Sequence, residues 1–166
     1  EELSLNDTSV MNVESLRGLI ELRFLEMQRT QVQDLSSLAK LDRLEVLKLN
    51  GSPIANLAPL ARLQQLHQLD ISRTNVEDIS PLANLVNLEE LYMTATQVRD
   101  LRPLAGLKKL ERLAINGTLV VDLTPLSNLS SLTTLTVYYS SVSKQQISAL
   151  SQELPNCTIE HFEFEQ

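Results

Sequence analysis

Leucine recurs along this chain at an interval of 22 residues. One repeat position is occupied by Leu3, Leu25, Leu47, Leu69, Leu91, Leu113 and Leu135. A hydroxyl residue keeps the same interval, at Thr8, Thr30, Ser52, Thr74, Thr96, Thr118 and Ser140. A period of this length, kept without a slip, is typical of a solenoid in which each repeat is one coil and neighbouring coils bury a shared core.

Each repeat divides into a strand and a return turn. In Leu69-Asp-Ile71 apolar and polar residues alternate, which predicts a short strand with one buried face. Stacked repeats would place equivalent strands about 4.8 Å apart in a parallel sheet. Ser80-Pro81 then begins a turn, because proline suits the first helical position, and we expect Ser80 to cap the free amides there. The residues left in the repeat allow only one 3₁₀ or short α turn.

The predicted fold is therefore an α/β solenoid. We expect a right-handed arc, with the parallel β-sheet on its concave face and the short turns on its convex face. Residues 1–142 hold the repeats and their seven strands. Residues 1–21 already follow the repeat pattern, with no capping segment before them. We therefore expect either that more repeats or another domain lie upstream, or that the first coil is left open and can dimerise.

The last 24 residues, 143–166, depart from the period and predict a C-terminal cap. Ser143 and Gln146 resemble a capping box, and an apolar helical face follows at Ile147, Leu150 and Leu154. Pro155-Asn156 ends this helix. Residues 158–164 then predict a final strand, with Thr158, Glu160, Phe162 and Phe164 on one side.

Charge and composition exclude several classes of function. The net charge of the 166 residues is -7, and the acidic excess lies at the two ends of the chain. The repeats carry no basic stripe, so nucleic acid is not expected as a partner. No apolar run is long enough to span a membrane. The single cysteine, Cys157, cannot form an intrachain disulfide, and we expect it to be a small buried apolar group.

Catalytic, metal and cofactor sites are not expected either. His67 and His161 lie far apart in the chain, and no Ser–His–Asp or Cys–His set can come together within one part of a solenoid. A column of acidic and amide residues, one per repeat, runs through Asn12, Asp34, Asn56, Asp78, Asp100 and Asp122. Calcium sites cluster their ligands more closely, so side chains that form Asx turns explain this column better.

The unit L-x-x-L-x-L-x-x-T-x-V-x-D-L-x-P-L-x-x-L resembles the 22-residue leucine-rich repeats of the internalin-like class of bacteria and the SDS22-like phosphatase regulators of eukaryotes. The resemblance covers about residues 1–142, and residues 154–159 are similar to the endings of bacterial leucine-rich repeat domains. One departure is consistent: the family usually has Asn where this chain has Thr or Ser. A ladder of hydroxyls can still bond the backbone turn that leaves each strand. The resemblance implies a protein-binding scaffold without catalytic residues.

Any specific chemistry must then lie in the variable positions of the concave face. All three tyrosines fall there, as do the only phenylalanine outside the cap and two arginines two repeats apart. Tyrosine and arginine are enriched at binding interfaces. The predicted partner-binding residues are Phe24, Arg29, Arg73, Tyr92, Asn116, Tyr138 and Tyr139. The alternative for the tyrosines is that they only cover neighbouring repeats, and for the arginines that they are only solvated. Glu26, Lys48 and Asp70 alternate in sign and should neutralise one another as a surface ladder.

The sequence thus predicts a non-enzymatic recognition module, without cofactor or metal, in a larger bacterial protein. Its partner would be a protein, or another domain of the same chain, bound by the concave face. The alternative is a structural spacer, an autoinhibitory region or an oligomerisation region. Localisation stays open: the sequence slightly favours the cytoplasm, with the bacterial surface or secretion as alternatives.

Overall fold

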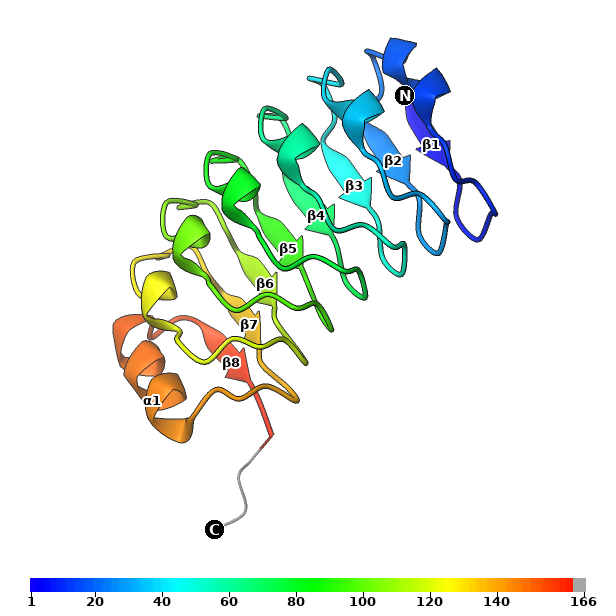
Figure 1. Ribbon diagram of the computed structural model, residues 1–166. Helices are drawn as coiled ribbons and strands as arrows, with labels where there is room; N and C mark the ends of the chain where they lie inside the picture. Colours follow the sequence, from blue (N-terminus) through cyan, green and yellow to red (C-terminus); the bar gives the residue numbers. More distant parts are fainter. Residues whose placement is uncertain (163–166) are drawn as a thin grey trace.

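The computed structural model describes residues 1–162 and shows an arc of stacked coils, each contributing one strand to a parallel sheet (Figure 1). The eight strands follow one another in chain order. Their bounds are β1 Glu2–Ser4, β2 Phe24–Glu26, β3 Val46–Lys48, β4 Gln68–Asp70, β5 Glu90–Tyr92, β6 Arg112–Ala114, β7 Thr134–Thr136 and β8 Thr158–Glu160. The predicted solenoid architecture is confirmed.

The 22-residue period sets the register of this sheet. Leu69 lies beside Leu47 on one side and Leu91 on the other. From β2 to β7 the central residue of each strand is buried and its two neighbours are partly or fully exposed. The leucines of successive coils therefore form one continuous core, while the flanking positions make up the exposed face of the sheet.

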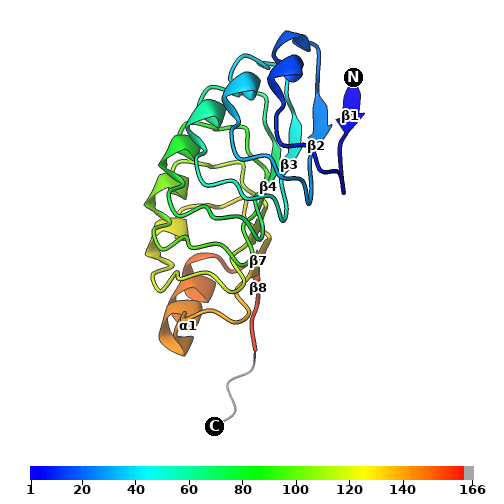
Figure 2. The same ribbon diagram turned by 45° about the vertical axis from the view of Figure 1, so that its right-hand side comes forward.

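The return segments form short 3₁₀ helices on the side opposite the strands (Figure 2). Their bounds are η1 Glu14–Gly18, η2 Ser36–Leu38, η3 Ala58–Leu60, η4 Ser80–Leu82, η5 Arg102–Leu104 and η6 Thr124–Leu126. In η3 to η6, proline occupies one of the first two positions, as its fixed φ favours.

The Asp/Asn column supports the start of each of these turns. Each of its six side chains accepts a hydrogen bond from the backbone N–H two residues later, over 2.7–2.9 Å. The prediction of Asx turns is confirmed. The predicted capping role of Ser80 is wrong: its hydroxyl donates to Asp78 over 2.8 Å, and Asp78 is the residue that accepts the free amide.

The hydroxyl column has the predicted role at the strand exits. Thr8, Thr30, Thr74, Thr96, Thr118 and Ser140 each donate to the carbonyl three residues earlier, over 2.6–3.1 Å. Ser52 differs, because it donates to Met27 of the preceding repeat over 2.7 Å. The residue just before each hydroxyl has a positive φ of 53–73°, namely Asp7, Arg29, Gly51, Arg73, Ala95, Gly117 and Tyr139.

At the C-terminal end, α1 Lys144–Glu153 packs on η6 and β8 extends the sheet beyond β7. The Ser143 hydroxyl accepts the Gln146 N–H over 3.2 Å, but the Gln146 side chain accepts from Leu123 instead of completing a capping box. Since helix and strand continue the same stack, the division between repeats and cap stays a prediction.

Two expectations for this end need correction. The final strand is shorter than predicted: β8 ends at Glu160, and Phe162 lies beyond it. The prediction for Phe164 lies outside the described residues. Cys157 is only half-buried, with burial raising the pKa of its thiol.

Candidate functional site

The concave face consists of the exposed strand positions together with the residues that follow each strand on the same side. All seven predicted partner-binding residues belong to it. Phe24 and Tyr92 lie in strands β2 and β5, while the other five follow a strand, at Arg29, Arg73, Asn116, Tyr138 and Tyr139. Whether they bind a partner stays a prediction, but the structure shows how each is held.

At the N-terminal end the face is hollowed. The hollow has a volume of about 610 Å³, and Phe24, Val46 and Leu3 supply its apolar surface. Glu2, Glu26, Lys48 and Gln68 are among its polar lining. The Arg23 guanidinium lies 5.9 Å from the centre of the Phe24 ring, which is within cation–π range. Val46 and Leu3 were not among the predicted site residues.

Charged residues beside the hollow pair with their equivalents one repeat away. The Lys48 Nζ lies 2.8 Å from Glu26 Oε1, and the ammonium lowers the pKa of the Glu26 carboxyl, helped by a hydrogen bond from Asn6. Arg29 forms a two-pronged contact with Asp7, at 2.6 Å for the Nη2–Oδ2 pair, and this contact lowers the pKa of Asp7. Arg29 is therefore held within the array.

Of the charge pairing that we expected along Glu26, Lys48 and Asp70, the described residues show only the pair of Lys48 with Glu26. Asp70 Oδ1 accepts the Ser72 N–H over 2.9 Å. Among residues 1–162, the exposed Arg73 side chain has neither an ion pair nor a hydrogen bond. Of the two predicted arginines, Arg73 is thus the one whose guanidinium is open to a partner.

A polar cluster occupies the middle of the face, centred on the carboxylate of Glu90. This carboxylate accepts hydrogen bonds from the Tyr92 hydroxyl over 2.7 Å and from Gln68 over 3.1 Å, and it forms an ion pair with Arg112. Burial, reinforced by the bond to Glu90, raises the pKa of Tyr92 to about 12. The cluster fixes the Tyr92 ring before any partner arrives, which reduces the entropy lost on binding.

Asn116 connects two repeats. Its side-chain carbonyl accepts the Tyr138 N–H over 2.8 Å, and its Nδ2 lies 3.4 Å from the Thr94 hydroxyl. Asn6 makes the equivalent bond to the Gln28 N–H at the other end of the face. Both side chains therefore support the backbone of the next coil, which the sequence prediction for Asn116 did not include.

At the C-terminal end lies a group of three aromatic rings, here called the aromatic cluster: Tyr138, Tyr139 and Phe162. The Phe162 ring centre lies 5.1 Å from that of Tyr138 and 4.7 Å from that of Tyr139, with edge-to-face geometry in both pairs. Tyr139 is 80% exposed and Phe162 49%. The sequence prediction placed Phe162 in the final strand, beyond which it lies, and did not include it among the partner-binding residues.

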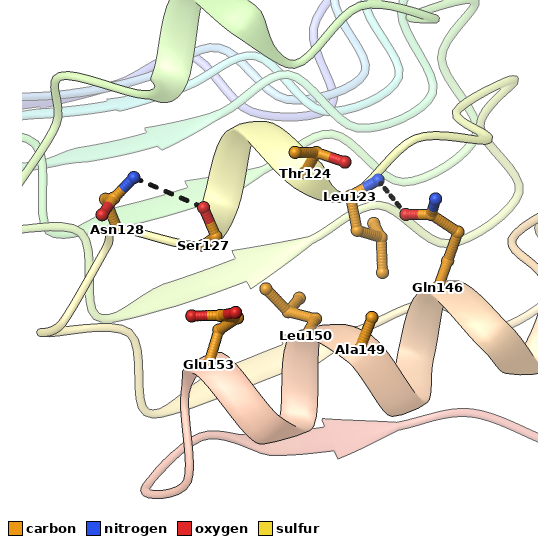
Figure 3. Close-up of a pocket in the computed structure, with 8 residues that line it drawn as sticks. All are labelled: Leu123, Thr124, Ser127, Asn128, Gln146, Ala149, Leu150 and Glu153. Atoms are coloured by element: carbon orange, nitrogen blue, oxygen red, sulfur yellow. Dashed lines mark hydrogen bonds between the residues drawn. The ribbon is translucent and has the colours of Figure 1, made fainter.

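A second, smaller pocket lies off the concave face, between η6 and α1 (Figure 3). Its volume is about 340 Å³, and Leu123, Leu150 and Ala149 supply its apolar surface. Gln146 crosses it to accept the Leu123 N–H over 3.0 Å. The pocket thus lies at the packing interface between the last repeat and α1, which covers it.

The described residues offer little for other chemistry. Within residues 1–162, no group of three or more His, Cys, Asp or Glu side chains could hold a metal ion. In the same range, no helix has both the length and the apolar character to cross a membrane. His67 lies 3.8 Å from Glu45, which also pairs with Arg23, and each of the three directly precedes a strand of the sheet. This leaves the concave face, with its hollow, its polar cluster and its aromatic cluster, as the candidate site.

Comparisons with known proteins agree with this geometry. Residues 64–106 match the family of leucine-rich repeats in two copies. The crystal structure of internalin C2 from Listeria monocytogenes superimposes with a TM-score of 0.90 at 35% sequence identity, over 99% of this chain and 74% of that one. The chain belongs to the internalin-like leucine-rich repeat family. Proteins with such repeats are generally protein–protein interaction modules.

More distant structures share the fold of this internalin-like chain. Internalin F of Listeria monocytogenes has a TM-score of 0.79 at 24% identity, over 98% of this chain and 56% of that one. A leucine-rich repeat protein of Leptospira interrogans has a TM-score of 0.77 at 17% identity, over 96% of this chain and 48% of that one. A search of curated proteins found no match.

Proposed function

We propose that this internalin-like chain recognises a protein through its concave face, without catalysis, as part of a larger protein. The observation that supports the proposal most is the position of the open apolar surface on this face. It lies at the two ends, in the hollow around Phe24 and in the aromatic cluster around Tyr139. Apolar side chains that line an open hollow, or that are exposed together as a cluster, are typical of interaction sites.

The two ends would act together on one partner. Phe24 belongs to β2 and Tyr139 follows β7, so five strand spacings separate them, which is roughly 24 Å. An extended segment of about eight residues spans that distance. Between the ends, the partner would lie over the Glu90 cluster, where Tyr92 is already fixed, and beside the open guanidinium of Arg73.

Site-specific photo-crosslinking tests this proposal. A photo-reactive phenylalanine would replace Phe24 or Tyr139 on the face, and Val86 or Val121 as controls. Both valines have large exposed side chains, at 50% and 57%, outside the concave face. In extracts of the source cells, we expect one covalent adduct shared by the two concave positions and absent from the valines. Adducts that form equally at Val86 would contradict the proposal.

Self-association is a second candidate, supported by a different observation. Met11, Leu19 and Ile20, all in the first repeat, are 72%, 39% and 57% exposed. If they mediate assembly, light scattering should show a mass that rises with concentration, and Ile20→Lys should abolish that rise. A constant monomer mass would eliminate this candidate and leave the concave-face proposal unaffected.

A further inference from the structure

The aromatic cluster is assembled by the pairing of the last two strands. Because Thr134 lies beside Thr158 and Thr136 beside Glu160, the chain beyond the strands places Tyr138 next to Phe162. Tyr139 follows in the left-handed conformation, at φ 53°, and its ring reaches Phe162 from another direction. Three rings thus meet at one corner of the concave face, although they come from two different coils.

The rings of this cluster do not stack on one another. Their interplanar angles with Phe162 are 64° for Tyr138 and 78° for Tyr139, so edges meet faces. With 80% of Tyr139 exposed, at least one face of its ring is open to solvent. An open aromatic face carries the negative part of the ring quadrupole and attracts cations.

A carboxylate stands beside these rings. Glu160 is exposed, and its Oε2 lies 3.5 Å from the Tyr138 hydroxyl. Within residues 1–162, no salt bridge involves Glu160, whereas Glu26 and Glu90 on the same face each have a basic partner. The corner therefore combines open ring faces with a negative charge that no described basic side chain balances.

We propose that this corner binds a cationic side chain of the partner, an arginine above all. The planar guanidinium would lie on the open face of Tyr139, with its N–H groups directed towards the Glu160 carboxylate beside Tyr138. This inference rests on the proposed function, since it specifies what the partner presents at one end of the face. A partner with an acidic segment would instead use Arg73, elsewhere on the face.

A peptide titration tests the inference directly. The probe is a glycine-rich peptide that carries two arginines and is blocked at both ends, so that its termini are uncharged. Its binding is monitored by NMR through the ring resonances of Tyr139 and Phe162. Matched peptides carry glutamate or proline in place of arginine. We expect saturable shifts only with the arginine peptide, with a Kd on the order of millimolar, as for a few exposed contacts.

Variants locate the binding site. Tyr139→Ala and Glu160→Gln should each weaken the arginine peptide by about two- to fivefold, and Glu160→Gln should also flatten the salt dependence. Both residues are exposed, so the variants should fold, which circular dichroism checks. Val86→Ala, which alters an exposed residue off the face, should change nothing.

Three results would overturn the inference: no saturable shift with arginine, equal or stronger binding of the glutamate or proline peptide, or unchanged affinity in both variants. The crosslinking experiment separates this failure from that of the proposed function. If adducts form at Phe24 and Tyr139 but the arginine peptide does not bind, only the cation site is wrong. If the peptide binds but no adduct forms on the face, protein recognition by this face is wrong.

Discussion

The residues with positive φ at the strand exits allow a direct test of how much backbone strain this conformation costs. Two of these seven residues are glycines, and the others carry a Cβ at positive φ. Ala95 and Gly117 occupy this position in neighbouring coils, with φ values of 56° and 62°. A Cβ on Gly117 would come no closer than 3.9 Å to the atoms of Ala95. Exchanging the two residue types therefore changes backbone strain with almost no change in packing.

The size of the effect follows from two opposing terms. A Cβ in the left-handed region costs about 1–2 kcal/mol, and glycine loses about 0.5–1 kcal/mol more conformational entropy on folding than alanine. The difference is roughly 0.75 kcal/mol in favour of glycine. Ala95→Gly should raise the free energy of unfolding by that amount, and Gly117→Ala should lower it.

Urea unfolding followed by circular dichroism measures both changes. With an m-value of about 2 kcal/mol/M, the midpoints should move by about 0.4 M in opposite directions at constant m. Gly106→Ala is the matched control, because Gly106 has no positive φ and open space around its Cβ position. It should raise stability by about 0.4–1 kcal/mol. If Gly117→Ala stabilises as Gly106→Ala does, the reasoning on backbone strain at positive φ is refuted.

Three further predictions concern the turns and the polar cluster. Ser37→Pro should raise the free energy of unfolding by about 1 kcal/mol in urea titrations, because η3 to η6 have proline at this position and the buried Ser37 hydroxyl has no partner within the described residues. A loss of stability would contradict this. Asp78→Ala should lower the melting temperature through the loss of about 1 kcal/mol of turn capping. Asp78→Asn should change it little, since Asn56 makes the same bond, and equal loss in both variants would argue against the Asx role. Finally, the Tyr92 resonance should titrate with a pKa of about 12 by ¹³C NMR. The Tyr92 pKa is higher in the folded state than in the unfolded chain. Its contribution to stability is therefore complete below about pH 10 and is lost as the pH rises towards 12. Glu90→Gln should lower this pKa, and an unchanged value would exclude the hydrogen bond as a cause.

Most of the fold could be predicted because the period constrains it directly. A strict 22-residue repeat in a parallel sheet leaves one register, so the pairing of Leu69 with Leu91 followed from counting. The Asx column was predicted for the same reason, because Asp or Asn at one repeat position makes the same turn bond in each of these coils. Ser80 was misread because serine and aspartate both cap helices, and only the backbone course shows that Asp78 faces the free amide.

The candidate site was harder to predict, because it depends on contacts between variable positions. The pairing of Arg29 with Asp7 had a usable signal, opposite charges 22 residues apart in one column. Gly51 and Gly117 share one repeat position and were a similar signal for its left-handed conformation, which the sequence prediction did not include. Phe162 had no such signal, because β8 pairs with β7 at an offset of 24 residues, outside the period. The bond that fixes Tyr92 to Glu90 depends on rotamers, which the pattern does not encode.

The affinity of face variants for the crosslinked partner tests the central claim most directly. Calorimetry would compare the unaltered chain with Phe24→Ala, Tyr139→Ala and Val86→Ala, once circular dichroism has confirmed that each variant is folded. If the concave face is the recognition surface, the first two substitutions should weaken binding by about tenfold or more, as expected for interface anchors, while Val86→Ala leaves it unchanged. Full affinity in both face variants would contradict the account.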